Sequence, residues 1–464
     1  MGPATTSVSE LCYLSASELG ELIRRGRVSS REIVQAAVDR ASATSEVNGI
    51  AVPLFDEALE AADKADAVIR RGERLGPLHG IPLTIKDGVA TKGHPNTFGA
   101  LANANDVATS DDVVWQRLRD AGAILLAKST TSEYFHKVTT DSQLYGVTRN
   151  PWALDYSPGG SSGGAAACLS AGIGTLAIGS DGGGSLRWPA SCTATFAIKP
   201  TMGRVPHVNF GDTFGNYSVL GPMARSAGDL GLLLNVIAGS ASTDAASIGR
   251  DRPVPLSNRG DTLRVGVVSL DGIDPQVEKC IASGLQGLAL QGVALTPFDG
   301  SFLDGSYDIY RVISSVGHAA RASFTTTDNQ AKWSDSFAAV VKEGLGYAAN
   351  AYHAAITART RLFRTVQSLF DAIDVIAMPV FSVPCLRIDD ESSVGLEAYG
   401  KAAATLYPFN LTGHPAISVP VGFTEQGLPV GLQLVGPWYS ESRLIAMAEL
   451  LEQPWLWRRR RPLL

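Results

Sequence analysis

The chain has 464 residues, of which 45% are hydrophobic and 18% charged, a composition typical of a large globular protein and not of a disordered one. Its 39 basic and 45 acidic side chains give a formal net charge of −6, which argues against nucleic acid as a partner. The five cysteines are scattered without a CxxC pair, as in a protein whose thiols stay reduced in the cytoplasm.

Neither a secretory signal nor a membrane span is predicted. Residues 1–9 lack a basic segment followed by an apolar one, and the longest weakly polar run, residues 165–179, is too short and too rich in Ala and Gly to cross a bilayer. We therefore expect a cytoplasmic protein without a membrane partner. The basic run Arg458–Arg461 is interpreted as a solvated end, with a partner-binding tail as the alternative.

The first elements expected along the chain are helices, over about residues 14–71. Ser15 or Ser17 can cap a first helix and Ser29 or Ser30 a second, because a serine side chain at a helix N-terminus accepts a hydrogen bond from a free backbone amide. Residues 56–71 have the pattern of a third helix.

Short apolar strands and helices then alternate along the chain. The expected strands are residues 81–85, 123–127, 175–178, 264–268, 374–378, 416–419 and 430–435, with helices over 163–171 and 275–290. This alternation favours an α/β fold in which helices cover both faces of one large sheet. The segment of about residues 300–361 differs, since aromatic side chains are dispersed there through a mostly helical pattern.

Three segments contain residues that can support nucleophilic catalysis. Lys86 lies in GIPLTIKD, Ser161 in SPGGSSGG and Ser185 in GSDGGGSLR. A serine hydroxyl is a weak nucleophile until a neighbouring base takes its proton. No histidine lies near either glycine-rich segment in the sequence, so Lys86 is the natural candidate for the base.

These segments resemble the amidase signature family, whose hallmark is a Gly/Ser-rich stretch that ends in a Gly-Gly-Ser nucleophile turn. The likeness is dense over residues 156–200 and returns over residues 408–436, so it covers nearly the whole chain. It implies a single large mixed β-sheet in a single amidase domain formed by residues 1–464. It also implies that the segment of about residues 300–361 varies among members and helps to wall the substrate pocket.

Ser185 is the predicted nucleophile because the three glycines before it free the backbone around it. Without Cβ atoms, Gly182, Gly183 and Gly184 can turn their N–H groups toward one point and let a carbonyl approach closely. Such donors stabilise a tetrahedral oxyanion, and in acyl-transfer enzymes the loss of one costs about 3 kcal/mol. The amides of Gly182, Gly183, Gly184 and Ser185 are therefore the predicted oxyanion hole.

The resemblance assigns Ser161 as a proton relay between Lys86 and Ser185, and it implies a cis peptide bond between Gly160 and Ser161. Lys86 must be neutral to accept a proton, and burial among apolar neighbours lowers the pKa of a lysine. Asp87 would oppose this effect if it pointed toward the amine, so we expect its carboxylate to point elsewhere. Lys86, Ser161 and Ser185 are thus the predicted catalytic residues.

Other residues of the matched segments are assigned supporting roles by their position in the family and by their capacity for hydrogen bonds. They are Ser162, Ser180, Asp181 and Arg187. Two positions depart from the family pattern, since Gly182 stands where members commonly have a side chain and Trp188 where the residue is usually smaller. Both departures bear on the range of substrates more than on the reaction.

Aromatic residues beside the matched segments are the predicted substrate pocket. They are Tyr134, Phe135, His136, Tyr156 and Trp188. A lining of this kind favours an uncharged aryl or alkyl carboxamide as the substrate.

The predicted activity is hydrolysis of a small to medium carboxamide through a serine acyl-enzyme, with release of a carboxylic acid and of ammonia or an amine. This chemistry needs no metal and no organic cofactor. Dimers are common among relatives, so a homodimer is a further outcome that the resemblance allows.

Three alternatives stay open. The chain can be the amidase component of a tRNA-dependent amidotransferase, which would need partner subunits and glutamine, although residues 405–413 are not typical of such a component. It can be a binding protein on the same fold, which the retained triad disfavours. Finally, GGSSG at residues 159–163 can be an esterase elbow with a Ser-His-Asp triad, but DYSP precedes it where a hydrophobic strand is required.

Overall fold

Most strands of the protein belong to one large mixed sheet. The structure, a computed structural model, describes residues 8–208, 215–249, 263–389, 402–452 and 460–464. Eleven strands of these residues form the sheet: β1 (Ile50–Pro53), β2 (Pro82–Lys86), β3 (Ile124–Ser129), β6 (Leu176–Asp181), β7 (Phe196–Lys199), β8 (Val219–Ala224), β9 (Arg264–Val268), β10 (Ala294–Phe298), β11 (Val375–Pro379), β12 (Ala416–Phe423) and β13 (Pro429–Val435).

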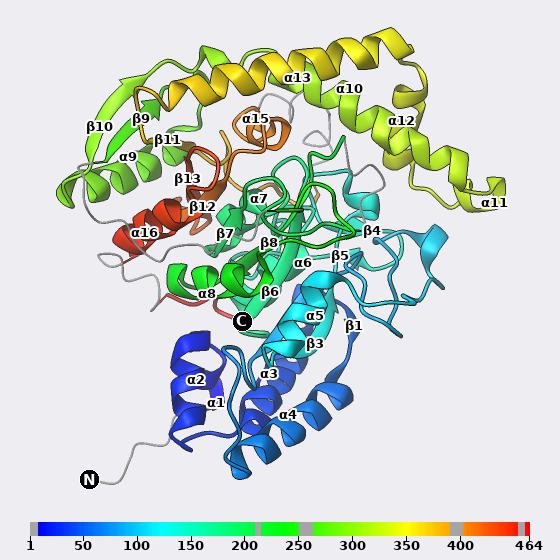
Figure 1. Cartoon of the computed structure of the whole chain (residues 1–464), viewed down its shortest axis with the longest axis vertical. Coiled ribbons are helices and arrows are strands. Elements are labelled where there is room, and N and C mark those ends of the chain that lie inside the picture. The colour runs from blue at the N-terminus through cyan, green and yellow to red at the C-terminus, as the bar shows by residue number, and fades with distance from the viewer. Residues whose placement is uncertain (1–7, 209–214, 250–262, 390–401, 453–459) are drawn as a thin grey trace.

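The strands are ordered β1-β3-β2-β6-β8-β7-β12-β13-β11-β9-β10 across the sheet. In Figure 1 the sheet runs from β10 at the upper left to β1 at the lower right. The pairs β2–β3, β2–β6, β9–β10 and β9–β11 are parallel, and the remaining pairs are antiparallel. A separate short hairpin pairs β4 (Asp141–Ser142) with β5 (Gly146–Val147). The predicted α/β fold with a large mixed sheet is therefore confirmed.

Helices cover both faces of the sheet. The side chains of β6 illustrate this, because Leu176 and Ile178 belong to the same buried cluster as side chains of α8 (Ala227–Ile237), α9 (Pro275–Leu290) and α16 (Glu441–Glu452), whereas Ala177 belongs to a cluster on the other side. Successive side chains of a strand point to opposite faces. The helices that share this second cluster with β6 are α6 (Gly163–Ala171) and α7 (Arg187–Thr193).

The first helices of the chain lie at the lower end of Figure 1: α1 (Val8–Leu11), α2 (Ala16–Arg24), α3 (Ser30–Ala43) and α4 (Phe55–Arg70). Ser15 and Ser29 cap α2 and α3, each in a capping box with the glutamate three residues later. The strand β1 follows α3 and is absent from the sequence-based expectation. Its sequence IAVP is apolar, but the strand is only four residues long, has proline at its end and is not fully buried, so the sequence alone does not mark it as a core strand.

Residues 300–361 form mainly helices, at the top of Figure 1. They comprise the short helix η4 (Ser301–Leu303), α10 (Ser306–Ala319), the short helix η5 (Ala320–Phe324), α11 (Thr327–Gln330), α12 (Asp335–Leu345) and the first part of α13 (Ala349–Leu369). α10 packs against both α12 and α13. Beneath them, Phe302, Ile313 and Val366 form a buried cluster with side chains of β11.

The cysteines and the C-terminus bear on two further expectations. All five cysteines are buried and free, as predicted. Arg458 and Arg459 lie outside the described residues, whereas Arg460 packs on the Phe423 ring at 4.2 Å and Arg461 on the Tyr13 ring at 4.4 Å. The described part of the basic run is thus exposed but in contact with the body of the protein. Among the described residues, no helix has the length and apolar character needed to cross a membrane.

Candidate active site

Lys86, the last residue of β2, is completely buried and contacts both glycine-rich segments. Its Nζ lies 2.7 Å from Ser161 Oγ, 3.0 Å from Ser162 Oγ and 2.9 Å from Ser180 Oγ. β6, which contains Ser180, is the parallel neighbour of β2, so the sheet itself brings these residues together. The peptide bond before Ser161 is cis, as the resemblance implies.

The environment of Lys86 favours the neutral amine. Burial lowers the pKa of Lys86 well below its ordinary value, and the charges of Asp181 and Asp87 oppose this effect only in part. The carboxylate of Asp87 points elsewhere, as expected, and accepts hydrogen bonds from the backbone N–H groups of Thr97 (2.9 Å) and Gly99 (3.0 Å). The ring of Phe135, which lines the cavity described below, has its centroid 4.2 Å from Nζ.

A neutral amine has two N–H donors and one lone pair for its three serine neighbours. Ser162 Oγ donates to the carbonyl of Ser180 at 3.1 Å, so Ser162 accepts from Lys86. The lone pair of Lys86 is then available to the hydroxyl of Ser161 or of Ser180. A relay through Ser161 follows when Lys86 donates to Ser162 and Ser180 and accepts from Ser161.

Ser185 lies between β6 and α7, and its segment contacts that of Ser161. The N–H of Ser162 donates to the carbonyl of Ser185 at 3.2 Å. Ser185 lines the same cavity as Lys86. Among the described residues no hydrogen bond joins the Ser185 hydroxyl to Ser161, and such catalytic contacts often tighten only when substrate binds.

The glycines before Ser185 differ in what their amides contact. The N–H of Gly184 donates to Asp181 Oδ1 at 2.7 Å. This amide is therefore not available to an oxyanion, contrary to the prediction that included Gly184 in the oxyanion hole. The amides of Gly182, Gly183 and Ser185 donate to no described residue, and all three residues line the cavity. A Cβ on Gly183 would lie 2.4 Å from Tyr310 Oη, whereas one on Gly182 would meet nothing closer than 3.5 Å.

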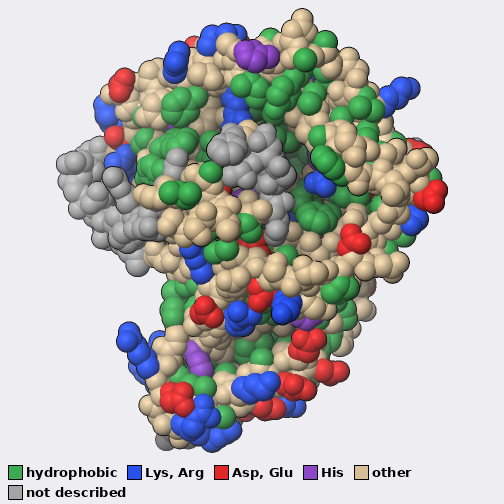
Figure 2. Space-filling view, turned by 45° about the vertical axis from the view of Figure 1, so that its right-hand side comes forward, with side chains coloured by type: hydrophobic (Ala, Val, Ile, Leu, Met, Phe, Trp, Pro, Cys, Tyr) green, Lys and Arg blue, Asp and Glu red, His purple; other side chains and the backbone are tan. Residues whose placement is uncertain are grey.

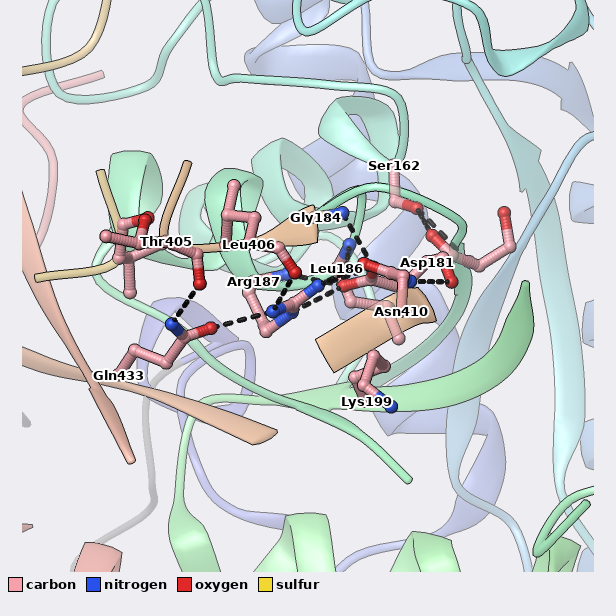
Figure 3. Close-up of polar contacts among 12 residues, drawn as sticks. Ser162, Asp181, Gly184, Leu186, Arg187, Lys199, Thr405, Leu406, Asn410 and Gln433 are labelled. Atoms are coloured by element: carbon pink, nitrogen blue, oxygen red, sulfur yellow. Dashed lines mark hydrogen bonds and ion pairs between the residues drawn. The ribbon is translucent and has the colours of Figure 1, made fainter. Parts of the chain in front are cut away.

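A buried ion pair holds the turn that contains Ser185 (Figure 3). Arg187 donates from Nε and a terminal nitrogen to the carboxylate of Asp181, both at 2.9 Å, and neither side chain is exposed. Burial alone would raise the pKa of Asp181, but the charge and hydrogen bonds of Arg187 outweigh it and hold this pKa well below its usual range. Asp181 also accepts from the N–H groups of Gly184 and Leu186, which fixes the backbone on both sides of Ser185.

Two residues of the C-terminal part, neither of them predicted from the sequence, complete this network. Asn410 of α15 (Tyr407–Leu411) donates to Asp181 at 2.9 Å and accepts from Arg187 at 2.6 Å. Gln433 of β13 accepts from Arg187 at 2.7 Å and donates to the carbonyl of Thr405 at 2.8 Å. The only sequence signal for Asn410 was its place in the late matched segment, and Gln433 stood out only as a polar residue within an apolar strand.

Lys86 and Ser185 line a cavity of about 570 Å³, whereas Ser161 is buried behind its wall. Its described lining includes aromatic, small and basic residues: Lys86, Phe98, Tyr134, Phe135, Ser180, Gly182, Gly183, Ser185, His207, Tyr217, Ser218, Tyr310, Ile313, His318, Arg321, Phe324 and Tyr352. Figure 2 shows hydrophobic side chains gathered on the upper part of one face and charged ones at the lower end. Much of the lining comes from α10 and η5, so the helical segment does wall this cavity.

Of the predicted pocket residues, the structure places Tyr134 and Phe135 in the cavity wall, and the other three elsewhere. His136 is held by Glu133 O at 2.6 Å and Ser336 Oγ at 2.9 Å. Trp188 is buried on α7, stacks on Phe381 at 4.0 Å and donates to the carbonyl of Val138.

Tyr156 is likewise outside the cavity, and its backbone forms an isolated bridge with Arg387. The backbone explains why Tyr134 and Phe135 do reach it. Both have a left-handed conformation, with φ of 45° and 66°, which turns this short segment back toward Lys86.

The esterase alternative is not supported. Ser161 Oγ contacts Lys86 and, within the described residues, no histidine. Residues 157–160 before it form no strand. His207 and His318 do line the cavity, but burial lowers their pKa values to about 4 and about 3. No group of three or more metal-binding side chains occurs in the described part of the chain.

Comparison with known proteins identifies the family. The sequence model described as Amidase matches residues 32–445. The chain belongs to the amidase signature family. It is thus a member of a family of enzymes that act on carbon–nitrogen bonds, and the recognition from the three segments is confirmed.

Members of the amidase signature family that resemble this chain have different activities. It is 33% identical over 490 residues to a component of the glutamyl-tRNA(Gln) amidotransferase of Moorella thermoacetica, covering 98% of this chain and 99% of that protein. It is 32% identical over 462 residues to the acylamidase of Rhodococcus erythropolis, covering 96% of both.

Solved structures that resemble this chain also have different names. The 6-aminohexanoate cyclic dimer hydrolase complexed with substrate matches with a TM-score of 0.88 and 29% identity, over 97% of this chain and 99% of that one. A bacterial aryl acylamidase of the amidase signature family matches with a TM-score of 0.88 and 26% identity, over 96% of this chain and 97% of that one.

Proposed function

We propose that this protein hydrolyses the C–N bond of a carboxamide through an acyl-enzyme on Ser185, with Lys86 as the base and Ser161 as the proton relay. The observation that supports this most directly is the buried amine of Lys86, 2.7 Å from Ser161 Oγ, beside the same cavity as Ser185. An amine held neutral by burial is a stronger proton acceptor than a serine hydroxyl.

The reaction proceeds in two halves. Lys86 takes the proton of Ser161 as Ser161 takes that of Ser185, and Ser185 Oγ forms a bond to the amide carbon. The amides of Gly182, Gly183 and Ser185 stabilise the resulting oxyanion. The C–N bond then breaks, the leaving amine receives the proton back through Ser161, and water cleaves the acyl-enzyme by the same route.

The roles of Ser162 and Ser180 are to position Lys86, since both contact its Nζ. Asp181 and Arg187 position the turn around Ser185. The aromatic side chains of Tyr134, Phe135 and Tyr310 in the cavity wall support an aryl or alkyl group next to the scissile amide.

A labelling experiment tests the assignment. A fluorophosphonate probe should label the wild type at Ser185, and the label should be lost in Ser185→Ala and slowed at least about 100-fold in Lys86→Ala and Ser161→Ala. Acetanilide and benzamide turnover should fall in parallel. Label on Ser161, or undiminished amide turnover in Ser185→Ala, would contradict the proposal.

A second candidate is the amidase component of a tRNA-dependent amidotransferase, because a component of such an enzyme is 33% identical to this chain over nearly the full length. Co-purified partner proteins and glutaminase activity dependent on them would favour it. Amide turnover by the isolated chain, without glutaminase activity, would favour the independent hydrolase. The homodimer stays a prediction that analytical ultracentrifugation can test.

A further inference from the structure

A second basic side chain, besides Lys86, lies in the wall of the cavity. Arg321 of η5 lines it together with Lys86 and Ser185. Its guanidinium carbon lies 4.7 Å from the Tyr134 ring centroid and 5.8 Å from that of Phe98. Among the described residues, its guanidinium has no carboxylate partner, in contrast to Arg187.

The charges of the cavity are unbalanced. Its described lining contains no aspartate or glutamate. Burial lowers the pKa values of His207 and His318 to about 4 and about 3, so both are neutral near pH 7, and it shifts the pKa of Lys86 in the direction that favours the neutral amine. Burial also lowers the pKa of Arg321, but a guanidinium keeps its charge at that pH. Arg321 is therefore the one permanent charge in the described lining.

An uncompensated cation in a partly dehydrated wall is unfavourable unless a ligand or the aromatic rings around it offset the cost. The rings of Tyr134 and Phe98 supply part of that compensation. They cannot supply hydrogen-bond acceptors in the plane of the guanidinium, where a carboxylate binds in bidentate fashion. The partner that would complete the site is thus anionic in character.

The position of Arg321 relates it to the catalytic centre. Lys86 Nζ lies over the ring of Phe135 and Arg321 over the ring of Tyr134, and these two aromatic residues are consecutive. The rings of Phe98 and Phe135 lie 5.7 Å apart, with Phe98 beside Arg321 and Phe135 beside Lys86. A ligand that reaches from Ser185 to Arg321 would pass along these rings, as a flat aryl spacer can.

We propose that Arg321 binds a carboxylate of the substrate, and that the protein prefers amides with a carboxylate remote from the scissile bond. This inference rests on the proposed amide hydrolysis, and it replaces the uncharged amide expected from the aromatic residues alone. The carboxylate can belong to the acyl part or to the amine part of the substrate.

Matched pairs of substrates distinguish a carboxylate on the acyl part from one on the amine part. On the acyl side, 4-carbamoylbenzoate is compared with 4-nitrobenzamide, and on the amine side 4-acetamidobenzoate with 4-nitroacetanilide, since a nitro group has the shape of a carboxylate without its charge. The measured quantity is the ratio of kcat/KM within each pair. Comparing this ratio between protein variants cancels the intrinsic reactivities of the two compounds.

The variants are Arg321→Gln and, as a control, Arg311→Gln. Arg311 lies on α10 and pairs with Glu343 at the surface, with 44% of its side chain exposed, so its loss changes the net charge equally without altering the cavity. On one side of the substrate, the carboxylate-to-nitro ratio should fall about tenfold or more in Arg321→Gln and stay within about twofold in Arg311→Gln. Equal ratios in all three proteins, for both pairs, would overturn the inference.

A binding measurement separates this inference from the proposed reaction. In Ser185→Ala, calorimetry should show that 4-carbamoylbenzoate or 4-acetamidobenzoate binds, and that adding Arg321→Gln weakens binding about tenfold or more. That result would support Arg321 as the carboxylate site even if no amide in the panel is hydrolysed. Equal affinities in the single and double variants would refute it, whatever the turnover.

Discussion

Replacement of Arg187 by methionine tests how strongly the buried ion pair holds the catalytic turn. Methionine keeps much of the volume but leaves the carboxylate of Asp181 without its counter-ion. The carboxylate would retain the N–H donors of Gly184 and Leu186 and the amide of Asn410, which moderates the loss. Breaking one partner of a buried pair typically costs about 3–5 kcal/mol.

Other hydrogen-bond acceptors also lose their donor, which raises the expected cost toward the upper end of this range. In Arg187→Met, the side-chain oxygens of Asn410 and Gln433 and the carbonyl of Leu406 would lose the guanidinium as donor. Each unsatisfied buried acceptor costs about 1 kcal/mol or more, although side-chain rotation recovers part of it. We expect the free energy of unfolding to fall by about 5 kcal/mol.

The assay is urea unfolding followed by circular dichroism, with the thermal midpoint as a second measure. Arg24→Met is the control, because Arg24 pairs with Glu21 on the surface, where the side chains are 54% and 45% exposed, and should change stability by less than about 1 kcal/mol. Asp181→Asn combined with Arg187→Met should be less destabilised than the sum of the single variants, by about 2 kcal/mol. A loss below about 1 kcal/mol in Arg187→Met would refute the reasoning.

Three further predictions concern the base, the glycine turn and the thiols. Because Lys86 acts only when neutral and its pKa is lowered, kcat/KM should rise with pH through a pKa below the usual lysine range and then level off, and a rate that falls over this interval would contradict the base assignment. Gly183→Ala should reduce kcat at least about tenfold because its Cβ would collide with the Tyr310 hydroxyl, whereas Gly182→Ala should retain most activity, and equal losses would contradict the packing argument. Since every cysteine is buried, Ellman's reagent should react with the native protein far more slowly than with urea-unfolded protein, and rapid native labelling would be inconsistent with the structure.

Elements with a regular pattern and clear ends could be predicted from the sequence. β9 matches the expected strand 264–268 and α9 the expected helix 275–290, because Asp274 caps a helix that has proline in its first turn. The link between Lys86 and Ser161 followed from the family resemblance, since residues 75 positions apart carry no local signal of contact.

The residues whose roles were predicted wrongly or not at all owe those roles to tertiary contacts that the sequence does not show. The amide of Gly184 is taken by a carboxylate three residues earlier, a competition between side chain and backbone that glycine content alone does not reveal. Trp188 lies next to Ser185 in sequence, but α7 turns it into the core against Phe381. Arg321 looks like an ordinary charged residue until η5 places it over the ring of Tyr134.

The ion pair of Asp181 and Arg187 is tied to Asn410 and Gln433, whereas the outer wall of the cavity comes largely from residues 306–324. The residues that hold the reacting atoms thus differ from most of those that meet the rest of the ligand, and Tyr310, which stacks on Tyr407 and borders Gly183, joins the two groups. Directed evolution toward new amides should therefore concentrate its mutations in cavity residues of 306–324 other than Tyr310, because the hydrogen bonds of Asp181 and Arg187 do not involve them.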